Sequence, residues 1–101
     1  MSYHVYVLYS FSVDKFYKVY TNNLEERINR HNSGREISTK FGAPWSLIWT
    51  TEKKSASKAM TLERKLKNLS RQRLLIFMNK YDIGLVNQEV FNKIQSHSSS
   101  S

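Results

Sequence analysis

The chain has 101 residues, enough for one domain with a single modest core, and 40% of them are hydrophobic, which indicates a folded protein. The lack of cysteine excludes a disulfide framework and a thiolate zinc site, and without a bilayer-long apolar run or a signal peptide we expect a cytoplasmic protein. A formal net charge of +8 favours a polyanionic partner, either a nucleic acid or a membrane surface.

Two strands and a helix are predicted in the first third of the chain. Residues 3–9 are apolar, aromatic and β-branched, which is typical of a buried strand. Residues 15–21 repeat that character, so the two segments are expected to form a hairpin. Asn22 or Asn23 can then cap a helix over residues 24–32.

A loop, a third strand and two helices are predicted next. Residues 33–44 are polar and hold glycine and proline, which indicates a loop, and residues 45–49 are typical of a strand. Ser55 or Ser57 can cap a helix that runs to about residue 69, and Ser70 can cap another helix directly after it.

The C-terminal part is less clearly patterned. Residues 81–95 are compatible with either a strand or a helix, and the serine-rich residues 96–101 are expected to be a disordered tail. We therefore expect one functional domain over residues 1–80, followed by an extension and the tail. The order strand-strand-helix-strand-helix-helix predicts an α/β (α+β) fold, in which helices flank a small, mainly antiparallel three-stranded sheet.

The helix over residues 24–32 carries an arginine and a histidine one turn apart. Leu24 and Ile28 mark its buried stripe, and Arg27 and His31 lie beside that stripe. Such a pair can face a phosphate group. Alternatively, the arginine stem covers the edge of the core and the histidine occupies the helix end, where the helix dipole favours it. The helix alone slightly favours the structural alternative.

A carboxylate falls within the apolar face of the following helix. At about 100° per residue, Glu63 projects among Ala59, Leu62 and Leu66. A buried carboxylate needs a partner, and Lys67 lies four residues further on, at ion-pair spacing. A lone carboxylate also suits Mg²⁺, which prefers oxygen ligands and keeps several of its waters. The ion pair and the metal site are equally compatible with the pattern.

Two tyrosines lie on the paired strands of the expected hairpin, at Tyr6 and Tyr17. Tyrosines on neighbouring strands are more often packing residues than catalysts. A functional role requires their hydroxyl groups to reach a cleft that Arg27 and Glu63 also reach.

Residues 53–80 contain nine basic residues and a single acidic residue, Glu63. A charge run of this kind is usually a solvated surface, but a long run of one sign favours contact with a polyanion. We expect nucleic-acid contacts from six side chains: Lys40, Lys58, Arg64, Lys67, Arg71 and Arg73.

A series of short motifs follows a fixed order through the chain. It includes His4-Val5-Tyr6 and Tyr17-Lys18-Val19, then the segments 23–27, 31–34, 38–40, 44–47 and 59–63. In this order and spacing the chain resembles the GIY-YIG nuclease superfamily, specifically its short single-domain branch. The resemblance extends from about residue 3 to residue 73.

The resemblance implies hydrolysis of a DNA phosphodiester with one divalent ion, Mg²⁺ or Mn²⁺, and DNA rather than a membrane as the partner. By position, Glu63 would hold the metal and Arg27 would bind the scissile phosphate. Tyr6 and Tyr17 would orient or deprotonate the attacking water, with His31 assisting. A metal and a guanidinium both stabilise charge on phosphoryl oxygens, which is consistent with these roles.

One position departs from the family pattern. Val19 stands where the second motif has glycine, and by strand alternation its side chain shares the face of Tyr17. A glycine within a strand often marks a close backbone approach, so a valine can narrow the site. We expect an endonuclease that is structure-selective or weakly sequence-specific. The alternative is a nucleic-acid-binding domain of the same fold in which Val19 impairs cleavage.

Overall fold

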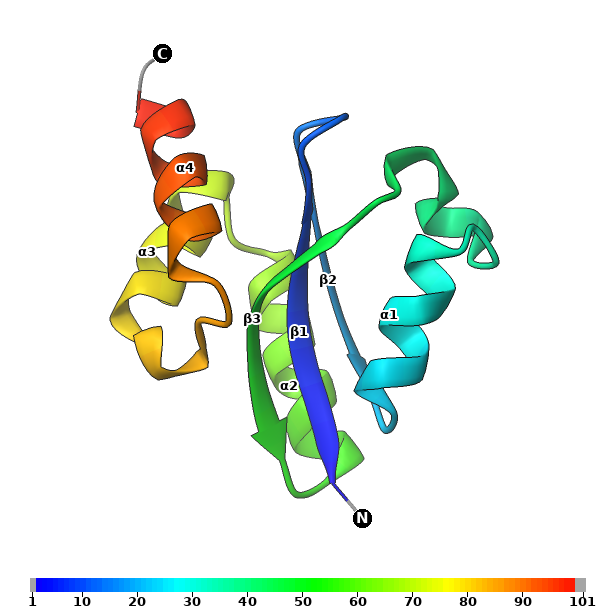
Figure 1. The fold of residues 1–101 in the computed structure, drawn as a ribbon. Coiled ribbons are helices and arrows are strands. Elements are labelled where there is room, and N and C mark those ends of the chain that lie inside the picture. The colour runs from blue at the N-terminus through cyan, green and yellow to red at the C-terminus, as the bar shows by residue number, and fades with distance from the viewer. Residues whose placement is uncertain (1, 100–101) are drawn as a thin grey trace.

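A three-stranded antiparallel sheet forms the centre of the computed structural model, which describes residues 2–99. β1 (Tyr3–Ser10) lies between β2 (Lys15–Thr21) and β3 (Ser46–Lys53), as Figure 1 shows. The predicted hairpin and the predicted α+β class are confirmed. β3 is longer than predicted, because the ladder with β1 continues to its last residue.

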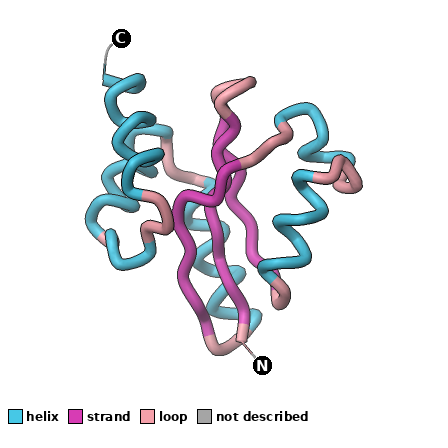
Figure 2. Tube along the Cα trace, in the orientation of Figure 1, coloured by secondary structure: helices cyan, strands magenta, loops and turns pink. Residues whose placement is uncertain are grey.

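Helices cover both faces of this sheet, as the tube view in Figure 2 shows. α1 (Leu24–Asn32) and the 3₁₀ helix η1 (Ile37–Gly42) lie on one side of the sheet. The remaining helices lie on the other side: α2 (Ala56–Lys67), α3 (Arg71–Lys80), η2 (Asp82–Gly84) and α4 (Gln88–Ser99). No helix in the described part of the chain is both long and apolar enough to cross a membrane.

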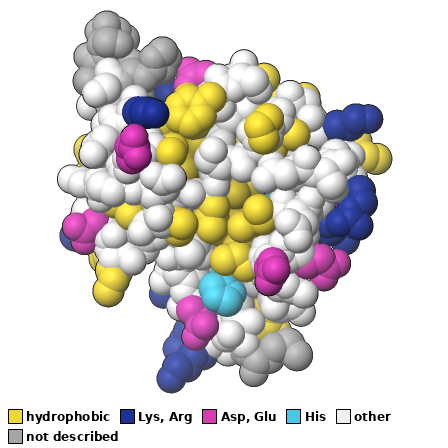
Figure 3. Space-filling view, in the orientation of Figure 1, with side chains coloured by type: hydrophobic (Ala, Val, Ile, Leu, Met, Phe, Trp, Pro, Cys, Tyr) yellow, Lys and Arg dark blue, Asp and Glu magenta, His cyan; other side chains and the backbone are white. Residues whose placement is uncertain are grey.

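The alternation of side chains along β1 divides the interior into two cores. Val5, Val7 and Tyr9 point to the larger core, which they form with side chains of α2, α3 and α4. Tyr6 and Leu8 point to the opposite, smaller core beneath α1. In the space-filling view of Figure 3, hydrophobic side chains gather in the middle and most Lys and Arg side chains lie at the margin.

The helix starts follow local side-chain chemistry, as predicted. Asn23, Ser55 and Ser70 each accept a hydrogen bond from the backbone N–H three residues later, at 3.2 Å in every case. These bonds satisfy N–H groups that have no partner within the helix. Gly34, just beyond α1, has a φ of +78°, a conformation that side chains rarely adopt.

The segment after α3 combines both structures that its sequence allows. Leu85 forms an isolated antiparallel bridge with Trp49, and the Val86 N–H donates to the Ile48 carbonyl at 2.8 Å. α4 follows and buries Phe91 and Ile94 completely in the larger core. This helix continues to Ser99, so residues 96–99 are helical where the sequence predicts a disordered tail. Residues 100–101 lie outside the described part.

Candidate active site

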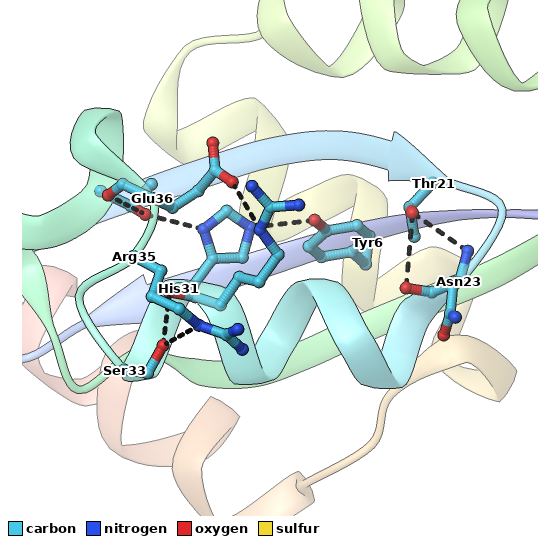
Figure 4. Close-up of polar contacts among 9 residues, drawn as sticks. Tyr6, Thr21, Asn23, His31, Ser33, Arg35 and Glu36 are labelled. Atoms are coloured by element: carbon cyan, nitrogen blue, oxygen red, sulfur yellow. Dashed lines mark hydrogen bonds and ion pairs between the residues drawn. The ribbon is translucent and has the colours of Figure 1, made fainter.

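A chain of hydrogen bonds links β1, α1 and η1 on one side of the sheet. The Tyr6 hydroxyl oxygen lies 3.0 Å from His31 Nε2, and His31 Nδ1 lies 2.7 Å from Thr39 Oγ1. Figure 4 shows the Tyr6 hydroxyl pointing at the imidazole from the strand beneath α1. All three side chains are completely buried. Two of the predicted site residues, Tyr6 and His31, are thus brought into direct contact.

One assignment of protons satisfies this chain. The Thr39 hydroxyl donates to the Glu36 carbonyl at 3.5 Å, so its oxygen is free to accept from His31 Nδ1–H. Nε2 then carries no proton and accepts from the Tyr6 hydroxyl. In this arrangement His31 is neutral, and Thr39 fixes both its tautomer and its ring orientation.

Arg27 lies one helical turn before His31, close to both members of the pair. Burial raises the pKa of Tyr6 to about 12, and the Arg27 guanidinium opposes that shift. Burial also lowers the pKa of His31, and here the Arg27 charge acts in the same direction. Arg27 Nε is buried and has no hydrogen-bond partner among the described residues. An unsatisfied buried donor costs about 1–3 kcal/mol, and a bound oxyanion would satisfy it.

Tyr17 reaches the same group of residues from β2. Its ring packs edge-on against the His31 ring, with centroids 5.4 Å apart. On its other side it contacts the Trp45 ring at 6.1 Å. Tyr6 contacts the same His31 ring, with ring centroids 6.1 Å apart. The structure therefore places Tyr6, Tyr17, Arg27 and His31 together.

Glu63 approaches from the other side of the sheet. It lies on α2, with a side chain that is 14% exposed. Its Oε2 accepts from the Tyr20 N–H at 3.1 Å, and its Oε1 lies 3.4 Å from Lys67 Nζ. β2 is an edge strand, so the carboxylate binds the backbone at the open edge of the sheet. Within the described residues, no hydrogen bond or ion pair joins Glu63 to the Tyr6–His31 pair.

Val19 lies between these two halves. It is the cross-strand partner of Tyr6 in the β1–β2 ladder, and it directly precedes Tyr20, whose N–H binds Glu63. Its side chain packs into the smaller core with Tyr17 and Leu24, on the face that strand alternation predicts. A substrate group that touched both halves would have to pass close to this side chain.

Glu63 offers a single carboxylate at this edge of the sheet, with the Tyr20 N–H and Lys67 as its neighbours. In the part of the chain that the structure describes, no group of three or more His, Cys, Asp or Glu side chains forms a metal cluster. Mg²⁺ does not need one, because it is often held by one or two carboxylates, several waters and substrate phosphates. Lys67 competes for Oε1, but its side chain is 52% exposed and can turn into solvent.

The six side chains predicted to contact nucleic acid lie on both sides of the sheet. Lys40 is exposed in η1, near His31, and the other five lie on α2 and α3. Since a helical turn takes 3.6 residues, Lys67 falls on the Glu63 side of α2, Arg64 falls about a quarter turn away and Lys58 falls on the opposite side. These residues do not form one continuous patch.

Arg71 has a structural partner that its sequence position does not predict. Its guanidinium binds the Asp14 carboxylate at 2.7 Å and lies over the rings of Tyr9 and Phe16, at 5.9 and 5.3 Å from their centroids. Tyr9 also donates a short hydrogen bond to Asp14. Arg71 therefore attaches α3 to the β1–β2 hairpin, unlike the exposed Arg73.

The sequence motifs include Thr39 and Trp45 but assign them no role. Trp45 Nε1 donates to the Thr39 carbonyl at 2.7 Å, and Asn32 makes two hydrogen bonds with the Trp45 backbone. A Cβ at Gly42 would lie 2.4 Å from the Trp45 ring, so only glycine fits there. The motifs that contain Thr39 and Trp45 mark this loop in the sequence. They do not indicate that Thr39 binds both His31 and Trp45.

Comparison with known proteins agrees with these motifs. The family model of the GIY-YIG catalytic domain matches residues 2–82, so the chain belongs to the GIY-YIG nuclease family. Among solved structures, it is similar to the solution NMR structure of the UPF0213 protein BH0048 from Bacillus halodurans. The identity is 30%, the alignment covers 78% of this chain and 84% of that chain, and the TM-score is 0.53. No curated protein matches the chain.

Proposed function

We propose that this protein is a metal-dependent endonuclease that hydrolyses DNA phosphodiester bonds with structure selectivity or weak sequence specificity. The observation that carries the proposal is the buried, unpaired Arg27 Nε beside the Tyr6–His31 pair. A single small domain offers little surface for reading a long sequence. The partner is DNA, and a cytoplasmic location remains a prediction from the sequence.

Arg27 is assigned to the scissile phosphate. A guanidinium offers donors in a planar fork, which suits two oxygens of one phosphoryl group. Nε has no hydrogen-bond partner among the described residues, and an unsatisfied buried donor destabilises the protein. A bound phosphate oxygen would give this donor a charge-assisted hydrogen bond. The same group would stabilise the charge that develops on these oxygens during attack.

Tyr6 and His31 are assigned to the attacking water. Tyr6 is buried in the free protein, so this assignment requires the bound DNA to bring the water to the Tyr6 oxygen. As the water oxygen bonds to phosphorus, its proton would pass to the Tyr6 oxygen while the Tyr6 proton would pass to His31 Nε2. The bond between phosphorus and the leaving oxygen breaks, that oxygen takes up a proton from solvent water, and His31 later returns its added proton to the hydroxide so formed. Arg27 lowers the pKa of free His31, and a phosphate bound to Arg27 offsets that charge. Substrate binding would therefore make His31 a better proton acceptor.

Glu63 is assigned to the metal. A bound Mg²⁺ or Mn²⁺ would polarise phosphoryl oxygens and lower the pKa of a water molecule. Glu63 is suited to hold such an ion because the Tyr20 N–H already fixes its orientation through Oε2. Lys67 would have to release Oε1, and its ammonium could then bind a neighbouring phosphate.

The alternative is a DNA-binding domain without efficient cleavage, and Val19 is the observation that favours it. Its side chain packs in the smaller core on the face of Tyr6, and it directly precedes Tyr20, whose N–H binds Glu63. A displacement of about 1 Å at a reacting group can reduce a rate about a hundredfold. DNA binding through Arg27 and the basic side chains would persist in that case.

The test is incubation with nicked, flapped and four-way-branched DNA in Mg²⁺ or Mn²⁺. We expect cleavage by the wild type, loss of cleavage in Glu63→Ala, and wild-type cleavage in the control Glu89→Ala, which removes an exposed carboxylate from α4. Cleavage that persists in Glu63→Ala would rule out the metal assignment. Binding of all three DNAs without any cleavage would favour the alternative.

A further inference from the structure

η1 presents three distinct rows of side chains. In a 3₁₀ helix, residues three apart lie above one another. Thr39 and Gly42 form the buried row of η1. The two other rows face solvent and pair an apolar residue with a polar one, Ile37 with Lys40 and Phe41 with Ser38. The side chain of Ile37 is 88% exposed and that of Phe41 is 58% exposed.

These apolar side chains are held exposed by a well-anchored backbone. Thr39 binds His31 through its hydroxyl and Trp45 through its carbonyl, each at 2.7 Å. Gly42 lies directly beneath the Trp45 ring, where a side chain would not fit. The segment therefore cannot rotate to bury Ile37 without breaking these contacts. A surface fixed in advance loses little conformational entropy when a ligand binds.

Cations flank the exposed apolar side chains. Lys40 lies within η1, and the exposed Arg35 precedes it, with Nε donating to Ser33 Oγ at 3.0 Å. The nearby Glu36 is paired with Arg30 at 3.3 Å and so does not neutralise Lys40 or Arg35. Figure 3 shows hydrophobic atoms next to Lys and Arg side chains at the right-hand edge, on the side where Figure 1 places α1 and the segment that follows it. Apolar and cationic groups side by side complement a nucleobase and its phosphate.

A row of rings connects this surface to the proposed active site. Phe41 packs edge-on against Trp45 with centroids 6.1 Å apart, and Trp45 contacts Tyr17 at the same separation. Tyr17 in turn contacts His31, which binds Tyr6. Phe41 is thus connected by successive ring contacts to His31, the partner of Tyr6.

We propose that η1 is a docking element for unpaired nucleobases. Ile37 and Phe41 contact bases of single-stranded or branched DNA, while Lys40 and Arg35 bind the adjoining phosphates. Stacked and paired bases in a duplex do not offer their faces, so this contact favours DNA with an unpaired strand. The inference rests on the proposed function for its choice of DNA as the partner, but it does not depend on cleavage.

The test measures binding without metal, in EDTA, by fluorescence anisotropy. The probes are a flapped DNA with a single-stranded arm and a fully paired duplex of equal length. The variant is Ile37→Ala/Phe41→Ala. The matched control is Ile83→Ala/Phe11→Ala: Ile83 is 98% exposed, and Phe11, 53% exposed, packs edge-on against buried Tyr9 as Phe41 does against Trp45.

We expect the variant to bind flapped DNA about tenfold more weakly, which is the usual size of one stacking contact, and to bind the duplex as the wild type does. The control should leave both affinities unchanged. Equal losses on both DNAs, no loss, or an equal loss in the control would overturn the proposal. So would a wild type that elutes as a dimer and a variant that elutes as a monomer, because a second copy would then cover η1.

The two proposals can fail separately. A wild type that cuts DNA but binds flapped and paired DNA equally well overturns the role of η1 and leaves the nuclease assignment. A wild type that shows the expected binding differences but cuts none of the DNAs in Mg²⁺ or Mn²⁺ does the reverse.

Discussion

At the scale of single residues, His31 connects structure and proposed chemistry. It is completely buried, and its two ring nitrogens join Tyr6 on β1 to Thr39 on η1. A buried polar group must keep its hydrogen bonds, so the same contacts that stabilise the smaller core also hold the Tyr6 hydroxyl in place. Burial keeps His31 neutral, which leaves Nε2 able to accept a proton.

The stability of the protein should therefore depend on pH through His31. Its pKa is lowered in the folded state, so below about pH 6.5 the unfolded chain binds a proton that the folded chain does not. The free energy of unfolding should fall as the pH falls from about 6.5 towards the lowered pKa, by at most about 1.4 kcal/mol per pH unit. In His31→Gln this contribution should be absent.

Urea denaturation at pH 7.5 and pH 5.5 measures the effect. The difference between the two pH values should be smaller in His31→Gln than in the wild type, although the variant is less stable at pH 7.5. An identical pH dependence in both proteins would show that His31 is protonated without cost in the folded state.

At the scale of elements, the contact between α3 and the β1–β2 hairpin distinguishes two neighbouring arginines. Arg71 binds Asp14, which has a φ of 54° in the hairpin turn, and covers the rings of Tyr9 and Phe16. Arg73, two residues later on the same helix, is exposed. Arg71 therefore stabilises the fold, whereas Arg73 lies at the surface.

Arg71→Ala should lower the free energy of unfolding by about 1–2 kcal/mol, because it removes a partly exposed ion pair and a cation–π contact. Arg73→Ala should leave stability unchanged and weaken DNA binding, with the salt slope reduced by about one unit. Urea denaturation and binding at several salt concentrations check both variants. A destabilised Arg73→Ala, or a reduced salt slope for Arg71→Ala with unchanged stability, would contradict this division.

At the scale of the whole molecule, the fold depends on a helix that lies beyond the matched family domain. The family model ends at residue 82, yet Phe91 and Ile94 on α4 are completely buried in the larger core. The extension therefore shares one core with the sheet. We propose that the functional domain of residues 1–80 does not fold stably without α4.

Phe91→Ala should destabilise the protein by about 3–5 kcal/mol, the usual effect of removing a fully buried phenyl ring. Glu89→Ala, on the same helix but exposed, should change stability by less than about 0.5 kcal/mol. Urea denaturation measures both. A Phe91→Ala variant as stable as the Glu89→Ala variant would show that α4 is an appendage rather than part of the core.

The sequence predicts elements whose signals are local. The buried strand over residues 3–9 and the caps at Asn23 and Ser70 depend on residues within a few positions, and the structure confirms them. The partners of Arg71 and the burial of Phe91 depend on contacts far apart in the chain, which periodicity does not encode. The sequence of α4 does not decide between a strand and a helix, and the burial of Phe91 and Ile94 depends on contacts with the larger core.

In the candidate site, too, the sequence predicts the local features and misses the contacts between distant residues. Helical spacing predicts that Arg27 and His31 lie beside the buried stripe, and the structure brings them to Tyr6. Spacing cannot predict that Glu63 binds a backbone N–H on an edge strand, because the bond joins residues far apart in the sequence. Whether the predicted site residues act in catalysis stays a proposal.

The most direct test of the nuclease assignment is the single-turnover cleavage rate of flapped DNA in Mg²⁺, measured for the wild type, Val19→Gly and Val19→Gly/Glu63→Ala. Val19 is the cross-strand partner of Tyr6 and directly precedes Tyr20, whose N–H binds Glu63. Glycine at this position removes side-chain volume beside Tyr6 and should let both halves reach one phosphate. We predict slow cleavage by the wild type, cleavage up to about a hundredfold faster in Val19→Gly, and none in the double variant. No cleavage by a folded Val19→Gly, or undiminished cleavage by the double variant, would contradict the account.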